Sequence, residues 1–181
     1  HPPIWVAGNP VKAGQIGGNL ITEGTIAGLP KINDLYSKTR DEHRNTESRF
    51  HFPKQPLVGV SKRLFIGKTN ESAIQRAKES FRIYRSNFQK PLPGGKSRRP
   101  RIMIESEIGK RILPWTIDFE TAIEREQIVA GSADSVINYL EKYQSDSSCN
   151  FLLLSFQWGN LNHDEAVNTM QIVGNEFIRS N

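Results

Sequence analysis

The chain has 181 residues, of which 36% are hydrophobic, and this length and composition are typical of one globular domain with a sizeable core. No apolar run approaches the roughly 20 residues that a membrane-spanning helix requires, so no membrane partner is expected. A single cysteine, Cys149, excludes an internal disulfide and favours a cytoplasmic protein. The chain begins with His and carries no signal peptide, so we expect a piece of a longer protein.

The net charge of +5 is concentrated in residues 90–111, which include seven basic and two acidic residues. A basic patch of this kind is compatible with nucleic-acid binding. However, Pro91-Leu92-Pro93-Gly94-Gly95 interrupts the stretch, and no aromatic residue is interleaved with its charges. These features favour a solvated excursion of the chain, and no nucleic-acid partner is expected.

The first predicted element is a strand at Ile4-Trp5-Val6-Ala7, followed by Gly8-Asn9-Pro10. A short apolar run bounded by Pro and Gly predicts a strand buried on both faces, as in parallel sheets covered by helices. Gly8 and Asn9 tolerate a left-handed backbone, and Pro10 suits the first turn of a helix. The amides at the end of such a strand form an anion site, or the three residues make only a turn.

The remainder of the chain alternates between predicted strands and helices. Further strands are predicted at residues 19–24, 57–67 and 150–156. After a short, glycine-broken helix at residues 11–18, helices are predicted to begin at Pro30, at Thr69 or Asn70, at about Asp118, at the N-cap Ser132 and at the capping-box residue Asn162. Residues 128–132 are predicted only as the lead into the Ser132 helix.

Apolar stripes on these helices predict the side chains that face the core. The expected inward residues include Ile32, Leu35, Tyr36 and Thr39; Ile74, Ala77, Phe81, Tyr84 and Phe88; Val136, Ile137, Leu140 and Tyr143; and Ala166, Val167, Met170, Val173 and Phe177. The alternation predicts four parallel strands in sequential order with their helices on one side. Residues 90–117 are then an irregular insertion rather than a fifth unit.

Taken in order, several segments resemble the carboxyl-terminal half of the bacterial luciferase-like, flavin-dependent monooxygenases. They are Pro2-Pro3-Ile4-Trp5-Val6-Ala7-Gly8-Asn9-Pro10, Leu20-Ile21-Thr22-Glu23-Gly24, Ile128-Val129-Ala130-Gly131-Ser132, and Asn150-Phe151-Leu152-Leu153-Leu154-Ser155-Phe156 with Trp158-Gly159 and His163-Asp164-Glu165-Ala166. The resemblance covers nearly the whole chain and rests on the order and spacing of these segments rather than on any one motif.

This resemblance implies an α/β fold: the last four strand–helix units of a TIM (βα)8 barrel. Residues 1–181 would form a single partial domain, a half-barrel, with an irregular insertion at about 90–117 before the last helix–strand pair. The segment after Asn9 departs from the family, which usually has a full helix there.

The resemblance also implies a flavin-dependent oxidoreductase, expected to be a monooxygenase that uses reduced FMN and O2 on a small organic substrate. The alternatives are a deazaflavin-dependent oxidoreductase that transfers hydride, or a non-catalytic half-barrel for binding or dimerisation. A flavin reductase would be a further partner. The complete protein is expected to be a homo-oligomer, and this chain alone is expected to be inactive.

The resemblance places the cofactor at the carboxyl ends of the strands. Carried over by position, the expected flavin-binding residues are Ala7, Gly8, Asn9, Lys12 and Arg63, the first four near the phosphate and Arg63 near the ring. Lys12 has a plainer interpretation as a surface lysine, and Arg63 as an outward-facing residue, since the phase of the strand decides its direction.

The expected substrate pocket is formed by Glu23, Gly24, Ser155, Phe156 and Trp158. Glu23 could act as a general base or be a solvated loop residue, and the two aromatic residues could form a pocket wall or only pack between core and loop. Gly131-Ser132 is a second candidate anion site, although helix capping also explains it. No metal site is expected, because the four histidines lack ligand spacing and Cys149 has no partner cysteine.

Overall fold

The computed structural model describes residues 2–44, 52–89, 104–106, 109–111 and 117–179. In chain order its elements are β1 (Trp5–Ala7), α1 (Pro10–Gln15), β2 (Asn19–Thr22), the 3₁₀ turn η1 (Ile26–Gly28), α2 (Leu29–Arg44), β3 (Val58–Ile66), α3 (Asn70–Gln89), β4 (Ile104–Ser106), β5 (Gly109–Arg111), α4 (Phe119–Glu124), β6 (Ile128–Gly131), α5 (Ala133–Asp146), β7 (Phe151–Ser155), α6 (His163–Ile172) and the π-helical turn η3 (Val173–Ile178).

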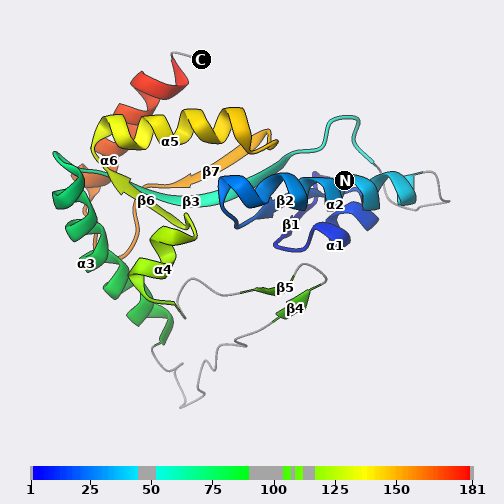
Figure 1. Cartoon of the computed structure of the whole chain (residues 1–181), viewed down its shortest axis with the longest axis horizontal. Coiled ribbons are helices and arrows are strands. Elements are labelled where there is room, and N and C mark those ends of the chain that lie inside the picture. The colour runs from blue at the N-terminus through cyan, green and yellow to red at the C-terminus, as the bar shows by residue number, and fades with distance from the viewer. Residues whose placement is uncertain (1, 45–51, 90–103, 107–108, 112–116, 180–181) are drawn as a thin grey trace.

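A parallel sheet forms the centre of the molecule (Figure 1). β1 pairs with β2, β2 with β3, and β3 with β7, so the four predicted strands are parallel and neighbours in sequential order. Ala7 lies opposite Ile21, Thr22 opposite Val60, and Arg63 opposite Ser155. This part of the prediction is confirmed.

β6 is a fifth parallel strand, which the sequence analysis did not predict. β3 has nine residues, and only its first three pair with β2. β6 pairs with its last four residues, from Arg63 opposite Ile128 to Ile66 opposite Gly131. Because Arg63 also pairs with β7, and Val60 pairs with both β2 and β7, β6 continues the edge of β3 that β2 occupies. It thereby satisfies backbone groups that β2 is too short to reach.

Four helices cover one face of the sheet. Val58 and Val60 of β3 pack against residues of α1, α2 and α5, and Leu64 and Ile66 pack against α5 and the α6–η3 segment. In Figure 1, α5 lies along the upper side of β3 and β7. For α1, α2, α5 and α6 this agrees with the prediction that the helices cover one side.

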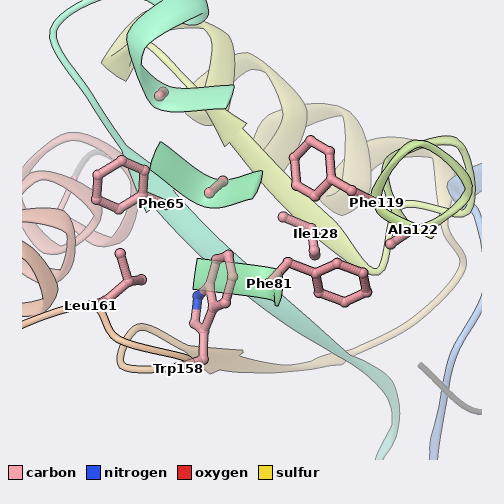
Figure 2. Packing of buried hydrophobic residues seen from close by; sticks show 9 residues of the cluster. Phe65, Phe81, Phe119, Ala122, Ile128, Trp158 and Leu161 are labelled. Carbon is pink, nitrogen blue, oxygen red and sulfur yellow. The ribbon is translucent and has the colours of Figure 1, made fainter. Parts of the chain in front are cut away.

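α3 and α4 depart from that prediction, because they pack at the carboxyl end of β3 against its other face. Phe65, whose side chain points away from Leu64 and Ile66, joins Ala77 and Phe81 of α3 and Phe119 of α4 in one core cluster (Figure 2). Trp158, from the segment after β7, completes the same cluster.

We call the rest of that second face, defined by Trp5, Arg63 and Leu153, the open face, because Trp5 and Leu153 are exposed there among the described residues. The neighbours Val6, Leu152 and Leu154 pack against the helices, so Trp5 and Leu153 point the other way. Trp5 is 40% and Leu153 is 48% exposed. The prediction that the strand at residues 4–7 is buried on both faces is therefore wrong, since the described residues cover only one face of β1.

The helix starts agree with the sequence signals. Asn9, Asp118 and Ser132 cap α1, α4 and α5, and Asn162 forms a capping box with Glu165 at the start of α6. α1 is short, as predicted. None of the described helices is both long and apolar enough to span a membrane.

Two predicted core residues point outward: Ile74 is 42% and Met170 is 49% exposed. Ala73 and Thr169 take the inward positions, and the Thr169 hydroxyl accepts a hydrogen bond from the Ile66 amide. Within the predicted insertion, β4 and β5 pair antiparallel, and most of residues 90–117 lie outside the described residues.

Candidate functional site

The predicted site residues follow the carboxyl ends of neighbouring strands. Gly8 and Asn9 come directly after β1, Glu23 and Gly24 after β2, and Arg63 lies in β3 beyond the end of β2. Because the strands are parallel, these ends meet at one edge of the sheet, where ligands of open α/β folds bind.

At the end of β1 the backbone turns sharply into α1. Gly8 has a φ of +68°, a left-handed conformation that favours glycine, and its amide donates a 2.8 Å hydrogen bond to the Ile21 carbonyl. The Asn9 side chain accepts a 2.9 Å hydrogen bond from the Lys12 amide. The Gly8 and Lys12 amides are therefore engaged, while among the described residues the Asn9 and Val11 amides have no such partner.

Arg63 points to the open face, which settles the direction that the sequence left open. Its Nη2 donates a 2.5 Å hydrogen bond to the Tyr84 hydroxyl, and the guanidinium carbon lies 4.3 Å from the centroid of the Tyr84 ring. Burial raises the pKa of Tyr84, and the charge of Arg63 opposes that rise. The sequence analysis placed Tyr84 in a packed stripe and missed this contact.

Glu23 joins the same group of side chains. Gln127 Nε2 donates a 3.1 Å hydrogen bond to Glu23 Oε2, and the negative charge of Glu23 contributes to the raised pKa of Tyr84. Gln127 is 5% exposed, and its Oε1 has no hydrogen-bond partner among the described residues. We call Glu23, Arg63, Tyr84 and Gln127 the carboxyl-edge cluster. No sequence motif marks Gln127, which becomes recognisable only once β6 is placed beside β3.

The three predicted pocket residues of β7 and its following segment do not gather at one place. Ser155 lies opposite Arg63 in the register, whereas Phe156 packs with the cluster around α5 on the helix-covered face. Trp158 is 6% exposed within the α3–α4 cluster (Figure 2), and its indole Nε1 donates a 3.3 Å hydrogen bond to the Leu64 carbonyl. A substrate-binding role for these residues stays a prediction.

The second candidate anion site lies at the start of α5. The Ser132 side chain caps the helix by accepting from the Ser135 amide, and the Ser132 amide donates a 2.8 Å hydrogen bond to Asn70 Oδ1. Capping and the α3 contact thus account for both polar groups of Ser132.

Comparison with known proteins gives a consistent picture, although no protein-family model matches the chain. An uncharacterised protein of Sinorhizobium fredii, y4wF, is 23% identical over 189 residues, which cover 98% of this chain and 48% of that protein.

Solved structures with a similar fold include the monooxygenase RslO1 from Streptomyces bottropensis, with a TM-score of 0.65, 15% identity and coverage of 99% of this chain and 48% of that one. The oxygenating constituent of 3,6-diketocamphane monooxygenase from Pseudomonas putida, solved with FMN, has a TM-score of 0.58 and 16% identity. The match covers 97% of this chain and 48% of that one. The coenzyme F420-dependent tetrahydromethanopterin reductase from Methanopyrus kandleri has a TM-score of 0.55 and 15% identity. This match covers 98% of this chain and 50% of that one.

The chain therefore spans about half the length of the proteins it matches. The chain has the fold of one half of the luciferase-like, flavin-dependent monooxygenases.

Proposed function

We propose that this chain forms the carboxyl-terminal half of a flavin-dependent (βα)8-barrel oxidoreductase, a monooxygenase that uses reduced FMN and O2 on a small organic substrate. The observation that carries the proposal is the carboxyl-edge cluster, which lies on the face and at the edge where a half-barrel of this fold presents its ligand site. Flavin- and F420-dependent oxidoreductases among the similar structures support the same class of cofactor.

The residues present fit the ring of a flavin. A flavin ring carries both acceptor atoms and an N–H donor along its polar edge. Arg63 supplies a cationic donor, and the buried Gln127 Oε1 is an acceptor that lacks a partner among the described residues. Gln127 and Arg63 would hold the polar edge of the ring, and Tyr84 fixes the direction of the Arg63 side chain.

The segment after β1 fits the phosphate end. The Asn9 and Val11 amides lie at the start of α1, and Lys12 adds a positive charge one turn on. Gly8 contributes its left-handed turn rather than its amide, which the sheet uses.

The bound flavin would supply oxygen activation or, for a deazaflavin, hydride transfer. The chain's own residues would orient the ring, exclude water through the α3–α4 cluster and place a carboxylate at the pocket mouth. Glu23, held by Gln127, is the group available to accept a proton from a substrate. The F420-dependent neighbours favour deazaflavin as the second candidate cofactor.

The proposal predicts that a negative charge at position 9 weakens FMN binding. Asn9→Asp retains a side-chain acceptor for the Lys12 amide, so α1 stays capped, but its charge repels the phosphate. In fluorescence titrations of the protein that carries this chain, we expect at least a tenfold loss of FMN affinity, about 1.4 kcal/mol. Riboflavin, which lacks the phosphate, should bind the variant and the parent equally.

Asn9→Ser is the matched control, because serine also caps the helix without adding a charge. Its FMN affinity should stay within about threefold of the parent. An Asn9→Asp variant that binds FMN as tightly as the parent would place the phosphate elsewhere. A parent protein that binds neither FMN nor F420 would contradict the proposed function itself.

A further inference from the structure

Lys62 is a buried cation on the helix-covered face of the sheet. Its side chain is 1% exposed, and along β3 it alternates with Ser61 and Arg63, which point the other way. The Lys62 ammonium donates a 2.6 Å hydrogen bond to the Gly24 carbonyl and lies 3.8 Å from Glu126 Oε2. A lysine in this position is unusual, since burying a charge costs free energy unless it is paired.

The carboxylate of Glu126 collects donors from separate parts of the chain. Oε2 accepts a 2.9 Å hydrogen bond from the Ile26 amide and a 2.8 Å hydrogen bond from the Tyr139 hydroxyl of α5. Glu126 adopts a φ of +54°, an unusual conformation for a residue other than glycine. Lys62, Ile26 and Tyr139 therefore meet at one oxygen atom, which links β3, the loop after β2, and α5.

The residue after Glu126 contacts the same loop from the open face. Gln127 donates to Glu23, while Glu126 accepts from Ile26 and shares Lys62 with Gly24. Residues 23–26 are thus held on the open face through Glu23 and on the helix-covered face through Gly24 and Ile26.

We propose that Lys62 and Glu126 form a clasp, a pair of positioning residues that fixes residues 23–28 at the carboxyl edge of the sheet. A second part of this inference rests on the proposed function: by holding residues 23–28, the clasp also fixes Glu23, and through it Gln127, at the ring end of the flavin site. Neither Lys62 nor Glu126 contacts the ligand, since both lie on the opposite face of the sheet from Arg63.

The electrostatic surroundings of Lys62 agree with this role. Burial lowers its pKa to about 8, while the charges of Glu126, Glu23 and Cys149 act in the opposite direction. Tyr139 of α5 also faces the clasp, with its ring centroid 6.0 Å from Lys62 Nζ, and burial raises its pKa. An apolar residue at position 62 would avoid the desolvation cost, so packing alone does not account for the lysine.

Hydrogen exchange tests the clasp without any flavin. Lys62→Met removes the donor to Gly24 and the countercharge of Glu126, whose side chain is 25% exposed and can then turn to solvent. We expect the amides of residues 26–29 to exchange at least tenfold faster, with the amides of β3 unchanged. Lys78→Met, which breaks the exposed ion pair with Glu120, is the control and should leave residues 26–29 unaffected.

Two results would overturn the clasp: unchanged exchange at residues 26–29, or uniformly faster exchange throughout the sheet, which would make Lys62 a packing residue only. Tyr139→Phe removes a single hydroxyl donor from Glu126 and provides a milder variant. It should produce a smaller increase confined to the same amides.

Flavin titration then tests the link to the proposed site. Lys62→Met should weaken FMN and riboflavin binding alike, several-fold or more, because the ring end is disturbed, whereas Asn9→Asp weakens FMN alone. Faster exchange at residues 26–29 with no flavin binding by the parent protein would leave the clasp standing and reject the proposed function. Faster exchange with unchanged flavin affinity in Lys62→Met would reject the link between the clasp and the site.

Discussion

Lys62 and Arg63 are adjacent in β3, yet their charges lie in opposite environments. Arg63 lies on the open face beside Tyr84, and Lys62 lies among the helices beside Glu126. The sequence analysis named Arg63 and left its direction open, because a strand's phase cannot be read from a run with charges at successive positions. Lys62 went unnoticed because its partners, Gly24 and Glu126, are distant from it in sequence.

The charge on Lys62 predicts a specific dependence of stability on pH. Its pKa is about 8 in the folded chain and 10.5 in the unfolded reference. Between these values the unfolded chain binds more protons, so the free energy of unfolding rises with pH as the buried ammonium becomes neutral. Below pH 8 both states are protonated, and this contribution is constant.

We expect the free energy of unfolding of the parent to rise by up to about 3 kcal/mol between pH 8 and 10.5 relative to Lys62→Met. Urea unfolding of the two proteins at matched pH values measures this difference and cancels the titration of other groups. A difference that stays flat, or falls, over this range would contradict a buried, charged Lys62.

At the scale of elements, α1 lies unusually close to α2. A Cβ atom at Gly14 would lie 2.8 Å from Thr39 Cβ, and 2.9 Å from both the Arg40 amide nitrogen and the Tyr36 carbonyl oxygen. The sequence analysis treated the glycines after Asn9 as a weakness of this helix. The structure gives Gly14 a packing role instead.

Gly14→Ala is therefore expected to destabilise the fold by about 1–3 kcal/mol, because overpacking outweighs the gain of about 1 kcal/mol in helix propensity. Gly174→Ala is the control, since a Cβ atom there would meet nothing within 4 Å. It should be neutral or stabilise by up to about 1 kcal/mol. The denaturant midpoint should thus fall for Gly14→Ala and stay or rise for Gly174→Ala, and an equal fall in both variants would reject the close crossing.

Local signals predicted the elements well, and packing explains the exceptions. Caps such as Asn9 and Asn162 act within one turn, so the sequence suffices to place them. Ile74 was expected inside because it continues the apolar stripe of α3, but the small Ala73 takes the inward position, where it lies so close to Gly67 that a Cβ atom on the glycine would come within 2.9 Å of the Ala73 Cβ. β6 was missed because its pairing depends on the length of β3 relative to β2.

At the scale of the whole molecule, the open face determines what the chain can do alone. Trp5 and Leu153 expose apolar surface, and among the described strands β1 and β7 each pair along one edge only. Such edges and faces favour association. Of the site residues named from the resemblance, Arg63 lies on this face, whereas Phe156 packs on the helix-covered face.

The central claim, half of a flavin-dependent barrel, is tested most directly by comparing the chain alone with the chain co-expressed with the half that it lacks relative to the similar structures. Size-exclusion chromatography and FMN titration are measured on both. We predict that the chain alone self-associates and does not bind FMN, and that the two halves form one species that binds FMN saturably. A monodisperse, cooperatively melting monomer of these 181 residues, or a joined barrel that binds neither FMN nor F420, would contradict the account.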